Sequence, residues 1–285
     1  MVRKEKKYSI GIDIGGTNMK AVLFNGQKAV MDSSLGTPKD SLDHILIMMT
    51  ALIEPLLKKA SEDKIKIKGI GLGVAGIVDT ANHTIVDSPN IPILSGVKLS
   101  EIVEGRLGFP TKMDNDAECF LRAEATVGSA TKIDNVYGIT LGTGIGGAWW
   151  NKGDIYYGTR GLSEPSRMIV DFNKGTTLEN AYHTLTQNNP LNLAVEAYRG
   201  DELARRAYEE VGQLLGLACV NILNILDPEA IIFGGGVIES SDLFLPAVKK
   251  NLEERMPNAS LRKIKILKSN LGNEAGAIGA ALLVN

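Results

Sequence analysis

An aspartate that follows an apolar strand and opens a helix is well placed to act as a general base. Asp116 has this position in the segment MDNDAE, with Asn115 beside it. During phosphoryl transfer such a carboxylate accepts the proton of the attacking hydroxyl, and correct positioning supplies most of the catalysis. The other interpretation is that Asp116 only complements the helix dipole, which is typically worth about 0.3–1 kcal/mol. The local sequence leaves both interpretations open.

Two glycine-rich turns carry backbone groups suited to a polyphosphate. The segments GIDIGGTNMKAVLFNG (11–26) and GITLGTGIGGAWWNKG (138–153) lie 127 residues apart. Each runs from an apolar strand through a glycine cluster into a second apolar strand. Glycines at such a turn allow positive φ and let backbone N–H groups approach an anion closely. The repetition favours a pair of phosphate-binding turns over two ordinary hairpins.

Other residues near these turns point to a metal ion and a nucleotide base. Asp13, at the end of the first apolar strand, is placed to hold Mg²⁺ directly or through water, although it could instead cap its own turn. The glycines at 234–236, after AIIF, offer a flat backbone surface for a base. The second turn contains G-x-G-x-x-G, but aromatic residues follow it instead of a helix, which excludes a dinucleotide site. The sequence also lacks a P-loop motif.

The elements that must position these groups alternate between strands and helices, which predicts an α/β fold. The helix from 115 to 128 begins with Asp114 or Asn115 as a good N-cap. Residues 154–189 have weak periodicity and read as rich in loops. The expected segments are a hairpin (8–32), helix (41–60), strand and small-residue turn (68–79), loop (88–96), helix (97–108), strand (111–115), helix (115–128), helix (201–226), strand–turn–helix (228–256), strand (262–269) and helix (273–285).

Composition limits the compartment and the class of partner. The chain has 285 residues, a formal net charge of −2 and two cysteines. This charge gives no basic footprint for nucleic acid, and two cysteines form neither a disulfide framework nor a cysteine-rich metal site. No signal peptide is evident, and no stretch reads as the roughly 20 apolar residues of a membrane span. We expect a cytoplasmic protein.

Two glutamates in the region 154–189 are further candidates for ligand binding. Glu164 lies in GLSEPSR, and Glu179 follows TTL. Glu179 also fits a capping box in which Thr176 is the N-cap and Glu179 is at N3. The three histidines lie on different predicted elements, which suggests neither a metal site nor a nucleophilic triad.

The motifs occur in the order of a known family. DIGGTN, GVAGIVD, SPNIP, the Asn115–Asp116 pair, LGTGIGG, GLSE, IIFGGG and EAGAIGAALL resemble, over essentially the whole chain, the ROK family (repressor, open reading frame, kinase). The resemblance implies the sugar kinase, Hsp70 and actin (ASKHA) superfold. In that superfold, two ribonuclease-H-like lobes each begin with a phosphate-binding hairpin, and ATP binds in the cleft between them. We expect a smaller lobe from 1–114 plus 272–285 and a larger lobe from 115–271.

By position, the resemblance assigns roles to the candidate residues. Asp116 matches the catalytic base, and Asp13 matches the residue that positions Mg²⁺ and phosphate. The implied sugar-binding set is Gly76, Asn90, Asn115, Asp116, Glu164, Arg167 and Glu179. The implied nucleotide-binding set is Asp13, Gly15, Gly16, Thr17, Gly142, Thr143 and Gly144, with Gly234, Gly235 and Gly236 for adenosine.

The chain departs from the family pattern after Glu164. Family kinases commonly read Glu-x-x-His followed by a cysteine cluster that binds structural zinc, but this chain has Arg167 in place of the histidine, and no cysteine follows before Glu179. Charged arginine does not ligate metals, so we expect no zinc site. Arg167 would bring a fork of donors suited to a carboxylate or to several hydroxyls. The alternative is that Arg167 pairs with Glu164 or Glu179 and holds the loop.

The resemblance implies an ATP- and Mg²⁺-dependent kinase that phosphorylates a hydroxyl of a monosaccharide or close analogue, and a homodimer. The alternative from another class is a sugar-sensing regulator without its own DNA-binding domain. Repressors of the family carry an N-terminal helix-turn-helix domain, whereas only residues 1–7 precede the first predicted strand here. A phosphohydrolase or other ATPase ranks last, because Asn115, Asp116 and Glu164 favour a polyol acceptor.

Overall fold

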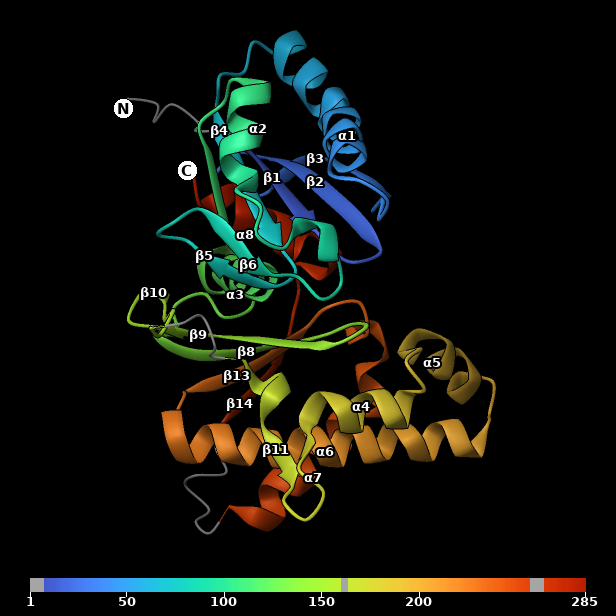
Figure 1. Cartoon of the computed structure of the whole chain (residues 1–285). Coiled ribbons are helices and arrows are strands. Elements are labelled where there is room, and N and C mark those ends of the chain that lie inside the picture. Colours follow the sequence, from blue (N-terminus) through green and yellow to red (C-terminus); the bar gives the residue numbers. More distant parts are fainter. Residues whose placement is uncertain (1–7, 160–163, 257–263) are drawn as a thin grey trace. The chain divides into compact units, whose positions relative to one another are not determined.

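The chain folds into two compact units, each built around a mixed five-stranded sheet (Figure 1). The structure is a computed structural model that describes residues 8–159, 164–256 and 264–285. The first unit comprises Met1–Val127, Tyr157–Leu162 and Glu274–Asn285, and the second comprises Gly128–Tyr156 and Ser163–Asn273.

The first unit has the strand order β3-β2-β1-β4-β7. Its strands are β1 (Tyr8–Ile14), β2 (Asn18–Phe24), β3 (Ala29–Gly36), β4 (Ile67–Val74) and β7 (Thr111–Asn115), with a small ribbon of β5 (Ile77–Asp79) and β6 (Thr84–Asp87). Its helices are α1 (Leu42–Glu62), η1 (Pro92–Leu94), α2 (Leu99–Leu107), α3 (Asp116–Val127) and α8 (Ala275–Leu282), and the turn η5 (Gly272–Glu274) precedes α8.

The second unit has the strand order β10-β9-β8-β13-β14. Its strands are β8 (Asn135–Leu141), β9 (Ile145–Asn151), β10 (Asp154–Ile155), β13 (Ala230–Gly234) and β14 (Lys265–Lys268), with a ribbon of β11 (Ile169–Asp171) and β12 (Thr176–Thr177). Its helices are η2 (Pro165–Arg167), α4 (Leu178–Thr186), α5 (Pro190–Tyr198), α6 (Glu202–Leu226), η3 (Ile238–Leu243) and α7 (Leu245–Arg255).

The two sheets share one topology. In each, three antiparallel strands from a continuous stretch of chain lie beside two parallel strands, and the repeated glycine turns join β1 to β2 and β8 to β9. Ile14 pairs with Met19 across the first turn, whereas Leu141 pairs with Ile145 across the second, so the second turn is one residue shorter. The predicted α/β class and the repeated hairpin are both confirmed.

Alternation along β1 places the candidate metal ligand. Ile10, Ile12 and Ile14 are buried in one hydrophobic core with residues of α1. The intervening residues face α8, because a Cβ added to Gly11 would overlap the Ala277 carbonyl and one added to Gly276 would lie 2.5 Å from Asp13 Oδ2. The period of two in a strand therefore puts Asp13 on the α8 face, opposite the isoleucines.

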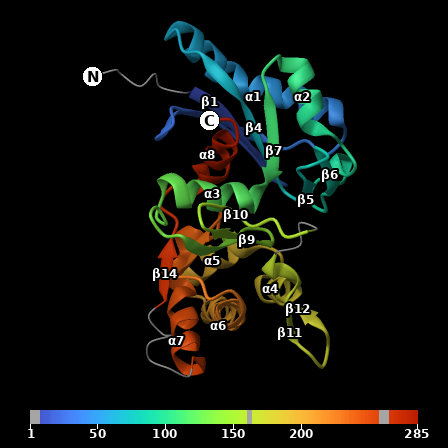
Figure 2. The same ribbon diagram turned by 90° about the vertical axis from the view of Figure 1, so that its left-hand side faces the viewer.

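Helix α8 packs so closely on its neighbours that only glycine fits at the contacts. A Cβ on Gly71 of β4 would overlap the Ala280 carbonyl, and one on Gly279 would overlap the Cys119 carbonyl of α3. Figure 2 shows α8 beside α3 and the strands of the same unit. Through this packing, the first unit includes α3 up to Val127 and resumes at Glu274 with α8.

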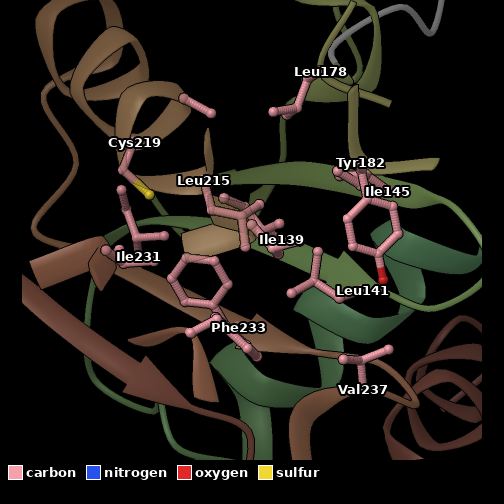
Figure 3. Packing of buried hydrophobic residues seen from close by; sticks show 14 of the residues in the cluster. Ile139, Leu141, Ile145, Leu178, Tyr182, Leu215, Cys219, Ile231, Phe233 and Val237 are labelled. Carbon is pink, nitrogen blue, oxygen red and sulfur yellow. The ribbon is translucent and has the colours of Figure 1, made fainter. Parts of the chain in front are cut away.

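The core of the second unit forms between its sheet and α4, α6 and α7. Figure 3 shows Phe233 of β13 and Ile139 of β8 packed against Leu215 of α6. By length and composition alone, helix α6 could cross a membrane, which the sequence interpretation did not anticipate. Half of the apolar 18-residue segment of this helix is, however, buried inside the protein. Such burial is the ordinary state of a core helix in a globular protein.

The region expected to be rich in loops is more ordered than its periodicity indicates. It contains the ribbon of β11 and β12 and the helix α4. Helix α4 begins one residue later than the capping-box interpretation requires, because Thr177 is the N-cap and its Oγ1 accepts the N–H of Asn180 at 3.2 Å. The capping box with Thr176 is therefore wrong. Of the GLSE motif, only Glu164 falls within the described residues.

Candidate functional site

Asn115 links the end of β7 to the start of α3. Its Oδ1 accepts the N–H of Ala117 at 2.8 Å and of Glu118 at 3.1 Å, so Asn115, and not Asp114, is the N-cap. Its Nδ2 donates to the carbonyl of Gly76 at 2.7 Å. The amide is thus fully oriented, and it brings the predicted Gly76 segment to the start of α3.

Gly76 is required by backbone geometry. It has φ +139°, and an added Cβ would lie 2.3 Å from the Asp87 carbonyl oxygen. A side chain at this position would strain the backbone and displace the ribbon of β5 and β6. Glycine at position 76 therefore allows the backbone conformation that places the Gly76 carbonyl against the Asn115 amide.

Asp116 affects the charge of Asp13 within the first unit. Desolvation raises the pKa of Asp116, and the N–H of Ala117, 3.0 Å from its Oδ1, partly offsets that effect. Burial raises the pKa of Asp13 to about 7, with the negative charge of Asp116 as the second cause, and Lys20 lowers it. Because the charge of Asp116 disfavours the charged form of Asp13, a cation bound beside Asp13 would stabilise its carboxylate.

The surroundings of Asp13 fit a divalent cation. Asp13 is half-buried, but its Oδ1 is inaccessible to solvent and has no hydrogen-bond partner among the described residues. Buried carboxylate oxygens without partners are costly, and Mg²⁺ accepts carboxylate oxygen and water as ligands. Gly276 leaves the space beside Oδ2 open, since a Cβ there would lie 2.5 Å away. No group of three or more metal-ligating side chains occurs among the residues that the structure describes.

The first glycine turn is closed by its own backbone and held by Thr37. The N–H of Gly15 donates to the carbonyl of Asn18 at 3.1 Å, and Thr37 Oγ1 donates to the carbonyl of Gly15 at 2.7 Å. Thr37 was not among the predicted site residues. Within the described ranges, no acceptor is bonded to the N–H groups of Gly16 or Thr17.

Asn90 lies beside this first turn. A Cβ added to Gly16 would be 3.0 Å from Asn90 Cβ, so glycine lets the exposed loop around Asn90 approach the turn. The first unit thus gathers three of the predicted features, namely the turn, Asn90 and the Asn115–Asp116 pair with Gly76.

The second glycine turn repeats the pattern in the second unit. The N–H of Gly142 donates to the carbonyl of Gly144 at 3.0 Å, and the N–H groups of Thr143 and Gly144 have no acceptor among the described residues. Two adjacent free donors at each turn are what an anion-binding turn requires. Strand β9 follows the turn, which confirms that no dinucleotide-type helix begins there.

The three glycines after β13 serve different purposes. Gly235 has φ +86°, and an added Cβ would lie 2.4 Å from the carbonyl oxygen of Leu141, so packing against β8 requires glycine. Gly236 has open space where a side chain would be. Gly236 therefore leaves room for a ligand, whereas Gly235 is explained by the fold. Gly234 is buried as the last residue of β13.

Glu179 lies against the second turn. Its Oε1 accepts the N–H of Ile145 at 3.2 Å, and a Cβ on Gly144 would lie 2.4 Å from that oxygen. The neighbouring side chains Tyr182 and His183 also contact the turn, and the sequence interpretation missed both. The sequence feature that could have identified them is their spacing of three and four residues from Glu179, since residues so separated share a helix face.

Glu164 and Arg167 lie at the two ends of η2. Glu164 is half-buried and accepts the Ser166 hydroxyl at 3.3 Å. Pro165 packs on β9, where a Cβ on Gly147 would lie 2.4 Å from its Cδ, and this contact explains the last glycine of the G-x-G-x-x-G pattern. Arg167 is exposed, and no ion pair joins it to Glu164 or Glu179 in the part of the chain that the structure describes.

A buried ionic cluster lies directly behind the start of α3. Asp114 is completely buried, and its Oδ2 accepts Arg122 Nη2 at 3.1 Å and the Tyr157 hydroxyl at 2.8 Å. Its Oδ1 accepts the N–H of Asn115 at 3.0 Å. Burial is the main cause that raises the pKa of Glu118 well above its usual range, and the adjacent Asp114 carboxyl raises it further. This cluster fixes the turn from β7 into α3 and attaches the segment that begins at Tyr157.

We expect Arg122→Met to lower the free energy of unfolding by about 3–5 kcal/mol at pH 8, because a buried carboxylate loses its cation. Urea denaturation followed by circular dichroism measures the change. The control is Lys98→Met, which removes an exposed pair with Glu101 and should cost about 0–1 kcal/mol. Equal effects of the two substitutions would show that the Asp114–Arg122 pair does not stabilise the unit.

Comparison with known proteins identifies the family of the chain. The ROK family model matches residues 9–165 and 171–285, so the interruption falls at η2 and β11. An N-acetyl-D-glucosamine kinase of Escherichia coli O157:H7 is 29% identical over 96% of this chain and 98% of its own length.

Solved structures show the same fold. The ROK family glucokinase from Streptomyces griseus, in complex with glucose and AMPPNP, superposes with a TM-score of 0.81 at 24% identity and covers 97% of this chain and 99% of its own. The ROK hexokinase from Thermus thermophilus superposes with a TM-score of 0.77 at 25% identity, with 97% of each chain covered. The paired glycine turns, the capped Asn–Asp start of α3 and the family match along both units thus have one explanation: this chain belongs to the ROK family, with the sugar-kinase fold of the ASKHA superfold.

Proposed function

We propose that the protein is an ATP- and Mg²⁺-dependent kinase that phosphorylates a hydroxyl of a hexose, an N-acetylhexosamine or a related sugar. The observation that carries the proposal is the pair at the start of α3. Asn115 is held by three hydrogen bonds, and Asp116 beside it has a raised pKa and lies within electrostatic reach of Asp13. The relatives named above are sugar kinases, which favours this reaction class over a regulator.

Asp116 is the proposed general base. A carboxylate whose pKa is raised by desolvation is a better proton acceptor than one in water. It takes the hydroxyl proton late, as the phosphoryl group passes through a loose transition state. Asn115 orients the acceptor sugar, and Asn90, Glu164 and Glu179 are the further proposed sugar ligands.

Asp13 is the proposed residue for holding Mg²⁺, directly or through a water molecule. Its partnerless Oδ1 supports this role. When bound, the ion neutralises negative charge on the phosphate oxygens of ATP. The free N–H groups of the two glycine turns are the proposed phosphate donors, and the open face at Gly236 is the proposed place for the adenine base.

A homodimer is also part of the proposal, because the family resemblance implies it, and so is a cytoplasmic location, which the composition indicates. The formal net charge of −2 supports a small-molecule acceptor over nucleic acid.

The test is release of ADP from ATP and Mg²⁺ with a panel of neutral hexoses, N-acetylated hexosamines, polyols and sugar acids. Turnover with one sugar class, together with a phosphorylated sugar identified by mass spectrometry, would establish the kinase. Tight binding of one sugar without turnover would favour the sensor, and ADP release that does not depend on any sugar would favour an ATPase.

Arg167 is the proposed selector among sugar classes. It is exposed, it has no ion-pair partner in the described part of the chain, and it lies in the stretch 166–170 that the family model does not match. We expect Arg167→Met to raise KM for the preferred sugar about 10- to 100-fold, the value of one charged hydrogen bond, and to leave KM for ATP unchanged. Arg199→Met, an exposed arginine after α5, is the control. Unchanged selectivity across the panel would exclude this role.

A further inference from the structure

Helix α4 presents three side chains to the second glycine turn. Glu179, Tyr182 and His183 are spaced three and four residues apart and therefore share one helix face. Glu179 Oε1 accepts the N–H of Ile145 at 3.2 Å, the Tyr182 hydroxyl contacts the carbonyl of Gly142 at 3.0 Å, and His183 Nε2 contacts the carbonyl of Thr143 at 2.9 Å. Figure 3 shows Tyr182 next to Ile145, with Leu141 nearby. Nearly the whole turn is thus bonded to one helix.

The direction of two of these hydrogen bonds is fixed by chemistry. A carbonyl oxygen only accepts, so the Tyr182 hydroxyl and the His183 ring must both donate. Burial raises the pKa of Tyr182, which keeps its hydroxyl protonated. His183 must carry its proton on Nε2, in either the neutral or the charged ring.

Holding a carbonyl also aims the next amide. The C=O of one residue and the N–H of the following residue belong to a single planar trans unit and point in opposite directions, and all peptide bonds here are trans. Tyr182, by holding the Gly142 carbonyl, turns the N–H of Thr143 away from α4. His183, by holding the Thr143 carbonyl, does the same for the N–H of Gly144.

These two amides are the ones left without an acceptor among the described residues. The same device occurs at the first turn, where Thr37 holds the Gly15 carbonyl and the N–H of Gly16 has no described acceptor. The two turns use unrelated side chains for one purpose, which argues against accidental packing.

We propose that Tyr182 and His183 are positioning residues that aim the amides of Thr143 and Gly144 at a phosphate group of the bound nucleotide. The inference rests on the proposed kinase function for the identity of the anion. The inference predicts that Tyr182 and His183 of α4 affect the affinity for nucleotide although neither of these side chains contacts the nucleotide.

The experiment compares two buried tyrosines. Tyr182→Phe and Tyr208→Phe each remove one hydroxyl from a completely buried ring, but the Tyr208 hydroxyl donates to the carbonyl of Pro190 at 2.7 Å, away from the turn. We expect both variants to lower Tm by a similar amount. Only Tyr182→Phe should weaken binding of Mg²⁺–ADP in the absence of sugar, by about 2- to 12-fold for one hydrogen bond. Isothermal titration calorimetry measures the dissociation constant.

His183 gives an independent check with a rescue. His183→Phe keeps the ring shape without a donor and should weaken ADP binding by a similar factor, whereas His183→Gln offers an N–H near the Nε2 position and should recover much of the affinity. In steady-state kinetics, KM for ATP should rise in Tyr182→Phe and His183→Phe, while the dissociation constant for sugar stays within about 2-fold.

Equal ADP affinity in Tyr182→Phe and Tyr208→Phe would overturn the inference, as would a loss in His183→Phe that His183→Gln fails to recover. These outcomes are separable from failure of the kinase proposal. A wild-type protein that binds Mg²⁺–ADP but phosphorylates no sugar would refute the proposed function, while the binding comparison would still decide the role of Tyr182.

Discussion

Asp116→Asn is expected to lower kcat by about 10²- to 10⁴-fold, the usual contribution of a general base. Asparagine keeps the size and hydrogen-bonding oxygen of the side chain but does not accept the hydroxyl proton at neutral pH. Asn115, the cap of α3 and the contact with Gly76 are unaffected, so the affinity for sugar should change by less than about 3-fold. ADP release gives kcat, and calorimetry with the preferred sugar gives the dissociation constant.

The competing interpretation is that Asp116 only complements the dipole of α3. Asp43, in the first turn of α1, is an acid with no proposed chemistry and provides the matched control. Asp43→Asn should cost about 0.3–1 kcal/mol of stability and leave kcat unchanged. If Asp116→Asn behaves in the same way, with a small loss of stability and near-normal turnover, Asp116 is not the base.

Asp13→Asn is expected to abolish turnover and, at the same time, to stabilise the protein without metal. The buried Oδ1 has no partner, and Asp116 repels its charge. Removing a charged buried group of this kind should raise the free energy of unfolding by about 1–3 kcal/mol at pH 8. Thermal unfolding in EDTA measures the gain, and ADP release measures the loss. A variant that is less stable than the wild type would show that Asp13 is well satisfied without a cation.

The raised pKa of Asp13 gives this prediction a definite pH dependence. The folded-state pKa is about 7, against an ordinary value of 3.8, so between these two pH values the folded protein holds a proton that the unfolded chain has released. The contribution of Asp13 to stability is therefore present below pH 4 and is lost as the pH rises through about 7. Asp13→Asn should remove this slope. Added Mg²⁺ should raise Tm of the wild type mainly above pH 7, where it no longer competes with the proton.

Patterns among residues that are close in the sequence predicted the parts of the site that depend on local geometry. The apolar alternation around Asp13 predicts which residues share a strand face, and the strand–helix transition at Asn115 predicts its role as a cap. The repeated glycine turns predict two equivalent sheets because each turn requires strands on both sides. These relations involve residues only a few positions apart, so the sequence expresses them directly.

Contacts between distant segments were not predictable in the same way. Asp114 bonds to Tyr157, and the second turn bonds to Tyr182, across more than thirty residues of chain in each case. Nothing in the periodicity of either segment specifies its partner. The capping-box alternative indicated the start of the short helix α4, but the weak periodicity did not indicate its length, since its nine residues are stabilised by packing against the second core and by the Thr177 cap more than by propensity. Its start shifted by one residue because two adjacent threonines both suit an N-cap.

The close fit of α8 against Gly11 and Gly71 has a consequence for synthesis of the protein. The helix that completes the first unit is encoded more than two hundred residues after β1. A ribosome therefore releases the whole second unit before the α8 face of β1 and β4 can be covered by its own helix. Until residues 275–282 emerge, that glycine-lined face lacks the helix that covers it in the folded protein, so the first unit cannot complete its packing before synthesis of the chain is nearly finished.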